Sequence, residues 1–177
     1  MRVRALRTSF WPLDKAGDVL RWYRDFITSA PEDLNGWFAF LTVPPVDPFP
    51  KELQGKKVCG VVWCYAGPAN KADAVFKPVA DFGPPLMHGV HSMPFPALQS
   101  AFDALYPPGD QWYWRADFVK ELSDAAIAEH QRFGPEMPTG KCTMHLYPID
   151  GAAHRPKAGD TAFSYRDANW ASVFAGV

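Results

Sequence analysis

Histidines are the residues of this chain whose chemistry could be acid–base or metal binding. His88 and His91 form an HxxH pair in a segment rich in glycine and proline, with no carboxylate or third histidine close by. A zinc site needs three or four ligands, so we expect no bound metal. His145 lies in a strand-like segment and could act as a general base, but a single histidine on a strand is more often structural or exposed. We therefore name no catalytic residue.

Nucleophiles and phosphate-binding loops give no stronger signal. No serine lies in a nucleophile elbow, and neither a GxGxxG fingerprint nor a Walker sequence is present. Cys59 and Cys64 are five residues apart in one predicted strand, so they should point to opposite faces and cannot share a metal. Together with Cys142 they are interpreted as small buried apolar residues. Chemistry alone does not identify a reaction.

A strand with one polar face offers a better candidate for binding. Residues 111–118 alternate, with an apolar face (Trp112, Trp114, Ala116, Phe118) and a polar face (Gln111, Tyr113, Arg115, Asp117). This period of two predicts a strand with one dry and one polar side. The polar side could form half of a binding site, or it could be a solvated sheet surface. Both interpretations remain open.

The elements that must position these residues follow from periodicity. Apolar residues at helical spacing predict helices at residues 13–29, 70–79, 97–105 and 123–133, with Asn70 and Ser123 as N-caps. Apolar or alternating runs predict strands at residues 3–11, 36–43, 57–65, 111–118, 141–147, 161–163 and 168–177. Residues 82–91 are expected to begin as a loop, and residues 149–159 to form another. The order indicates an α+β fold: a single antiparallel β-sheet with helices packed on one face, in one domain over residues 1–177.

Composition limits the class of function. A net charge of −1 argues against nucleic-acid binding, and no apolar run approaches the roughly 20 residues of a membrane helix. The first residues lack the apolar core of a signal peptide, so a cytoplasmic location is expected. Aromatic residues make up 15% of the chain, with 7 Trp and 13 Phe, which is more than a core of this size needs. Some of them are expected to face a partner.

Four stretches, in chain order, carry a resemblance to a known family: FWPLDKAGDVLRWYRDF; LNGWFAFLTVPP followed by KKVCGVVWCYAG; FGPPLMHGVHSMPFPALQSAFDALYPPGDQWYWRADF; and GAAHRPKAGDTAFSYRDANW. Together they resemble the substrate-binding half of the FAD-linked oxidases related to berberine bridge enzyme, in particular the bacterial members. The third is the most specific. The resemblance spans nearly the whole chain.

This resemblance implies a sheet with helices on one face, whose other face covers a flavin and a substrate. Carried over to this sequence, it makes seven polar residues candidates for substrate binding: Tyr113, Arg115, Asp117, His145, Tyr147, Tyr165 and Arg166. Family members place a flavin-binding half before this one and a tail after it, and neither is present in this sequence. The chain alone is therefore expected to bind no cofactor, with FAD implied only for the complete architecture.

Two functions follow as hypotheses. The first is the substrate-binding domain of an FAD-dependent oxidoreductase of the oxidase type, inactive alone and requiring a flavin-binding half in trans. The alternative is a non-enzymatic binding module that forms a homodimer through the uncovered sheet face, because exposed apolar surface tends to find partners. The small-molecule substrate is not specified by the sequence.

Overall fold

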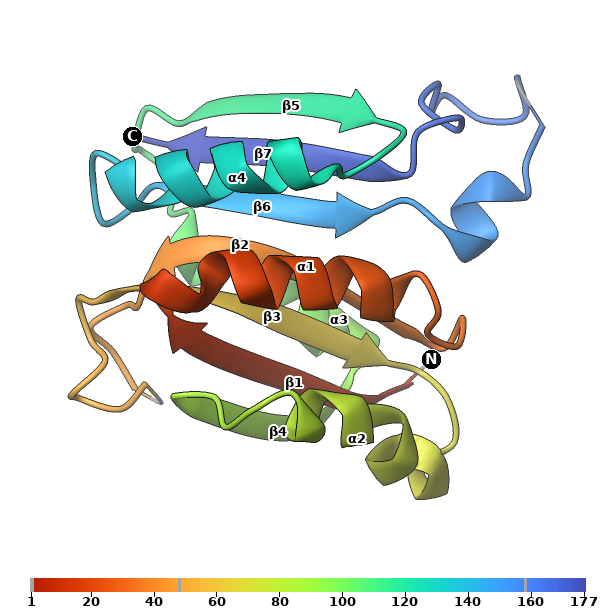
Figure 1. Ribbon diagram of the computed structural model, residues 1–177, viewed down its shortest axis with the longest axis horizontal. Helices are drawn as coiled ribbons and strands as arrows, with labels where there is room; N and C mark the ends of the chain where they lie inside the picture. The colour runs from red at the N-terminus through yellow and green to blue at the C-terminus, as the bar shows by residue number, and fades with distance from the viewer. Residues whose placement is uncertain (1, 48, 158) are drawn as a thin grey trace.

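One seven-stranded antiparallel sheet forms the centre of the molecule (Figure 1). The computed structural model describes residues 2–47, 49–157 and 159–177. The strands lie in the order β4-β1-β3-β2-β6-β7-β5. Their bounds are β1 Arg2–Pro12, β2 Leu34–Thr42, β3 Lys57–Tyr65, β4 Met87–Pro94, β5 Tyr113–Val119, β6 Thr143–Pro148 and β7 Trp170–Gly176.

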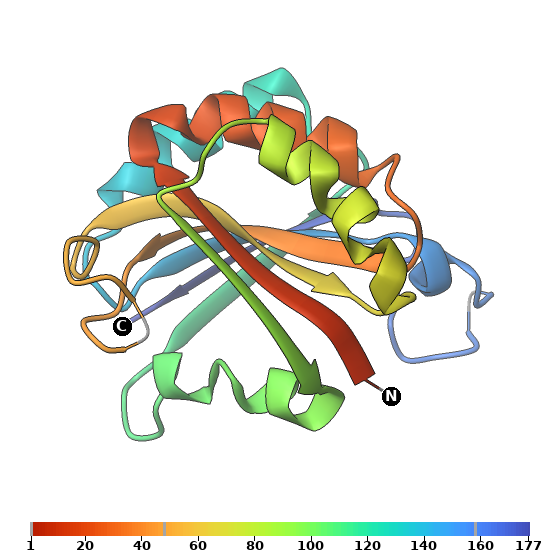
Figure 2. The same cartoon turned by 90° about the horizontal axis from the view of Figure 1, so that it is seen from below.

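Helices lie unequally on the two faces of the sheet. The three longer ones, α1 (Ala16–Ile27), α2 (Ala72–Asp81) and α4 (Asp124–Phe133), cover one face, which we call the helix face (Figure 2). The short helix α3 (Phe95–Ser100) lies with the 3-10 turn η3 (Asp103–Leu105) on the other side, which we call the open face. The α+β class is confirmed, and α3 is the exception to the single helical layer. No helix in the described residues is both long and apolar enough to span a membrane.

The main core lies between the helix face and α1. Val19, Leu20 and Tyr23 are fully buried, which confirms the apolar stripe of the predicted helix at residues 13–29. Its first turn is the 3-10 turn η1, Leu13–Lys15. Tyr23 packs edge-on against Trp63, and its hydroxyl donates a hydrogen bond of 2.7 Å to the Gly36 carbonyl. Burial of this polar group is therefore compensated.

Strand β3 has the predicted bounds and is buried on both faces. Cys59 belongs to the core under α1, whereas Cys64 packs on the open face with Leu6, Val62 and Leu98. The prediction that the two thiols point to opposite sides is confirmed. Both faces of this strand are covered because α3 and its flanking residues pack on the side that the long helices leave uncovered.

Helix α4 also begins as predicted, and α2 does not. The Ser123 hydroxyl accepts a hydrogen bond of 3.2 Å from the Ala126 amide, as an N-cap does. Asn70 lies instead within the 3-10 turn η2 (Ala69–Lys71), and α2 starts two residues later without a side-chain cap. The predicted N-cap at Asn70 is therefore wrong.

Three further segments differ from the prediction. Residues 83–85 form the predicted loop, but residues 87–94, for which no strand is predicted, form the edge strand β4 because they pair along β1. Residues 161–163 form no strand. The helix predicted over residues 97–105 is divided into α3 and η3, which lets the chain turn across the open face.

The alternation in residues 111–118 is present, but its predicted dry side is wrong. Trp114 is 50% exposed and Ala116 is exposed, although the pattern predicts that both face a core. The reason is that this side of β5 belongs to the open face, away from the three longer helices, and that β5 is an edge strand (Figure 1). The contacts of Trp114 with Tyr106 and of Phe118 with Tyr165 cover this side only in part.

Candidate functional site

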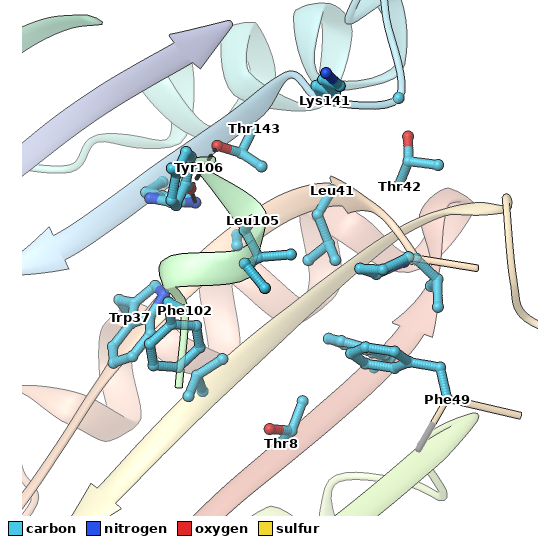
Figure 3. A pocket seen from close by; sticks show the side chains of 18 of the residues that line it. Thr8, Trp37, Leu41, Thr42, Phe49, Phe102, Leu105, Tyr106, Lys141 and Thr143 are labelled. Carbon is cyan, nitrogen blue, oxygen red and sulfur yellow. Dashed lines mark hydrogen bonds between the residues drawn. The ribbon is translucent and has the colours of Figure 1, made fainter. Parts of the chain in front are cut away.

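A pocket of about 720 Å³ lies on the open face. The sheet forms its floor, to which β1 contributes Thr8 and β2 contributes Trp37 and Ala39. Residues 102–107 cover one side, and Phe49 with Pro44 and Pro45 borders another (Figure 3). Most of the lining is apolar, which is typical of sites for small organic molecules.

Aromatic side chains form one wall of this pocket. The Trp37 ring packs edge-on against Phe102, with ring centroids 5.2 Å apart, and stacks against Tyr147 at 6.0 Å. Trp114 from β5 lies 4.9 Å from the ring of Tyr106. These rings come from β2, β5, β6 and the segment after α3, so the wall exists only when the whole sheet is assembled.

Polar groups gather at one place in this apolar lining. The Tyr106 hydroxyl shares a hydrogen bond of 3.1 Å with Thr143 Oγ1 and lies 3.5 Å from His145 Nε2 (Figure 3). His145 Nδ1 shares a 2.8 Å hydrogen bond with the Tyr147 hydroxyl. Thr143, His145 and Tyr147 alternate along β6, so they all point to the open face.

Burial keeps this polar set uncharged at neutral pH. Loss of hydration lowers the pKa of His145 to about 4, so its imidazole is neutral. Burial, with a smaller contribution from Tyr106, raises the pKa of Tyr147 to about 12. Burial also raises the pKa of Tyr106, against the opposing effect of its hydrogen bond to Thr143. A neutral imidazole beside two phenols can bind a hydroxyl or carbonyl group of a ligand, but it presents no charge.

The single cation of the described lining is already paired. Lys141 Nζ lies 2.5 Å from Asp110 Oδ2. A dinucleotide diphosphate is usually held by several backbone amides or cations. The described residues of this pocket therefore do not fit the phosphates of FAD, and they fit an uncharged, largely apolar molecule better.

The structure brings together two of the seven predicted site residues. His145 and Tyr147 both line the pocket. Tyr113, Arg115 and Asp117 pair with Gly176, Phe174 and Ser172 of β7 and share the helix face with them, so they lie on the opposite side of the sheet from the pocket.

The remaining two lie beside the pocket rather than in it. The Tyr165 ring stacks on Phe118 at 4.0 Å, on the open face but outside the lining. Arg166 binds the Ala153 carbonyl and the Thr161 hydroxyl and so ties its own loop together. A role in substrate binding stays a prediction for all seven residues.

Sequence reasoning missed Trp37, Phe102, Tyr106 and Thr143. Trp37 lies in an apolar run whose two faces cannot be told apart from the sequence. Thr143 could have been found from the strand period, because it lies two residues before His145 on the same face. Tyr106 immediately precedes a Pro-Pro-Gly break, which marks a turn but does not show what the turn covers.

The HxxH pair does not converge on one site. His88 pairs with Ser9 and His91 with Leu6, on opposite faces of β1. No cluster of potential metal ligands occurs among residues 2–47, 49–157 and 159–177.

Comparisons with known proteins agree with this architecture. No family model matches the chain. An FAD-linked oxidoreductase of Dictyostelium discoideum is 26% identical over 119 residues, which cover 66% of this chain and 26% of that protein. Berberine bridge enzyme from Eschscholzia californica is 14% identical with a TM-score of 0.71, covering 98% of this chain and 35% of its own. Chitooligosaccharide oxidase is 14% identical with a TM-score of 0.67, covering 98% and 38%.

These relatives are much longer than this chain, which spans about a quarter of the first and little more than a third of each solved structure. The similarity in fold nevertheless extends from one end of this chain to the other. The resemblance to the FAD-linked oxidoreductases related to berberine bridge enzyme is thus confirmed: the chain has the fold of one part of these proteins.

Proposed function

We propose that this chain is the substrate-binding part of an FAD-dependent oxidoreductase of the oxidase type. The observation that supports it best is the pocket on the open face, the face that the resemblance assigns to the flavin and the substrate. A flavin-holding part, encoded separately or elsewhere in a longer polypeptide, would complete the site. The pocket's neutral polar set would orient an uncharged aromatic substrate through its hydroxyl or carbonyl group.

Exposed aromatic residues support contact with such a second part. Phe95, Trp114 and Tyr165 are 37%, 50% and 50% exposed. Trp114 lines the pocket, Tyr165 stacks on Phe118 on the open face, and Phe95 begins α3 on the same side of the sheet (Figure 2). Exposed aromatic side chains on one face are costly to leave in water and are typical of surfaces that become covered. A flavin-holding part seated on these residues would also close the pocket.

Binding of small uncharged aromatic compounds to the purified chain tests the first part of this proposal. We expect a set of phenols and aromatic alcohols to change the tryptophan fluorescence saturably, because Trp37 and Trp114 line the pocket. Gly140→Trp should block binding, because Gly140 lies at the rim and an added Cβ would have only Thr42 Cγ2, at 3.7 Å, as its nearest neighbour. The backbone there can therefore carry a side chain, and the indole would occupy the opening. Lys77→Trp, on the exposed surface of α2, is the matched control and should bind normally.

Reconstitution tests whether this chain combines with a flavin-holding part. The flavin-holding half of a related FAD-linked oxidoreductase, mixed with this chain, should form a complex that protects the open face from hydrogen exchange. Failure of every aromatic ligand to bind, together with no complex, would overturn the proposal. Stoichiometric FAD bound to the purified chain alone would contradict the division of roles.

A second candidate is a binding module that self-associates and performs no reaction. The same exposed residues on the open face support it, because a second copy could cover them instead of a flavin-holding part. Aromatic ligands would then compete with self-association, and dilution would increase ligand affinity. Ligand binding that does not depend on protein concentration would exclude this candidate.

A further inference from the structure

The outer edge of β5 is open and long enough to pair with another strand. Within the described residues, β5 pairs only with β7, so half of its backbone amides and carbonyls face away from the sheet. Residues 113–117 and Val119 are exposed on the strand itself. An exposed edge of this kind is a template for strand addition unless it is protected.

We propose that two copies of this chain pair through β5 in antiparallel fashion, about a two-fold axis at Ala116. The evidence is the self-complementary order of the side chains along the strand. In this register Arg115 lies opposite Asp117 of the second copy, and Asp117 lies opposite its Arg115. Trp114 lies opposite the second copy's Phe118, and Tyr113 opposite its Val119. This inference does not depend on the proposed function, because it rests on the backbone edge and the side-chain order of β5, although Trp114 also lines the pocket.

Charge complementarity on the helix face supports pairing with a second copy of the chain. Arg115 and Asp117 are both exposed, and neither forms an ion pair within the part of the chain that the structure describes. Opposite charges placed directly across two antiparallel strands stabilise the pair. The two-fold axis would form this ion pair twice.

The aromatic residues support the same register on the open face. Trp114 is 50% exposed, and Phe118 already stacks on Tyr165 with ring centroids 4.0 Å apart. Trp114 of each copy would extend the aromatic cluster of the other. Aromatic pairs across strands are among the favourable ones.

Neighbouring symmetric registers lack this complementarity. An axis at Arg115 places two arginines opposite one another, and an axis at Asp117 opposes two aspartates. Like charges directly opposite are destabilising. The order Arg115-Ala116-Asp117 therefore favours the axis at Ala116. The two Ala116 residues can then form either a hydrogen-bonded or a non-hydrogen-bonded pair, because both kinds occur in antiparallel sheets.

Sedimentation of the whole chain over a range of concentrations tests the proposal. We expect a reversible dimer of twice the 19.7 kDa chain mass. Arg115→Asp and Asp117→Arg, each alone, should lower the association constant roughly tenfold or more, because like charges then face each other. Mixing these two variants should restore the dimer, since every arginine again meets an aspartate. Glu52→Lys, an exposed charge reversal in the turn at residues 51–55, is the control and should dimerise as the unchanged protein does.

Cross-linking checks the register. Ala116→Cys should form a disulfide between copies, because residues opposite each other in antiparallel strands lie within disulfide range at their Cα atoms. Val119→Cys is the matched control, since the axis holds the two copies of that residue roughly 20 Å apart. A monomer at all concentrations, a dimer insensitive to both charge variants, or equal cross-linking at the two positions would overturn the proposal.

Discussion

The His145 imidazole is the residue at which pH and stability are most directly linked. Burial lowers its pKa from 6.5 to about 4 in the folded protein. As pH falls below 6.5, the unfolded chain takes up a proton that the folded protein does not bind until about pH 4. The free energy of unfolding should therefore fall across this window, by about 3 kcal/mol in total, with full stability above pH 6.5.

Denaturant unfolding at several pH values measures this effect. His145→Gln should make the pH dependence between pH 6.5 and 4 shallower by the contribution of His145, because glutamine does not titrate; burial also lowers the pKa of His88, so a smaller slope from His88 should remain. His91→Gln, at an exposed position, is the control for the substitution itself. Identical slopes for the His145 variant and the unchanged protein would contradict burial as the cause.

Tyr106 fastens the segment after α3 to the sheet. Its hydroxyl shares a hydrogen bond with Thr143 and approaches His145, which joins the cover of the pocket to β6. Tyr106→Phe should lower the free energy of unfolding by about 1 kcal/mol, because a half-buried hydrogen bond is lost. Tyr113→Phe, at a position that is 58% exposed, should change it little. Equal effects of the two substitutions in a urea titration would show that the Tyr106 hydroxyl contributes nothing specific.

Individual residues could be predicted only where a local period fixes their direction. His145 and Tyr147 are predicted site residues that do line the pocket, because they share one side of a strand. Tyr113, Arg115 and Asp117 also share one side, but the sequence does not state which side of the sheet that is. An edge strand that is covered only in part lacks the burial pattern that would have decided it.

At the scale of single elements, α4 depends on its first residue. Ser123 accepts a hydrogen bond from the Ala126 amide, one of the amides that a helix leaves unpaired at its start. Ser123→Ala should cost about 1 kcal/mol of stability, and Ser123→Asp should retain most of it. Thermal unfolding monitored by circular dichroism distinguishes the two. A loss of equal size in both variants would mean that the cap is not the cause.

Pairing of β1 with β3 depends on a close approach at Gly60. A Cβ at this position would lie 2.4 Å from Phe10 Cδ1 and 2.6 Å from the Ser9 carbonyl oxygen, and the backbone atom cannot move aside. Gly60→Ala should therefore cost about 2 kcal/mol through overpacking. Gly140→Ala is the control, because its nearest contact would be 3.7 Å. Comparable unfolding midpoints for both variants would argue against this close approach.

Elements were predictable where the sequence pattern and the burial agree. Strand β3 has the predicted bounds because its continuous apolar run is covered on both faces. Strand β4 was missed because Gly89 and the two histidines interrupt any alternation, and its pairing with β1 is a long-range property. Residues 161–163 carry an apolar pattern but find no neighbouring strand. Pairing partners, rather than propensity, decide short edge segments.

Across the whole molecule, a short junction joins two groups of strands. The β2–β6 ladder consists of three residue pairs, Phe38 with Leu146, Ala39 with His145, and Phe40 with Met144, whereas β1 and β3 pair over eight. The buried cluster under α1 draws mainly on β2 and β3, while β5 is exposed along its length. We therefore expect the β6–β7–β5 group to open at a lower free energy than the β4–β1–β3–β2 group.

Native-state hydrogen exchange should resolve this difference by comparing β3 with β7, since each is an interior strand of its group. The amides of β7 should exchange through the lower-energy opening. Because the pocket is lined from β1, β2 and β3 in one group and from β5 and β6 in the other, an aromatic ligand spans the junction and should raise protection in β7 more than in β3. One common opening free energy for both strands, with or without ligand, would show that the sheet behaves as a single unit and that the pocket does not couple its two groups.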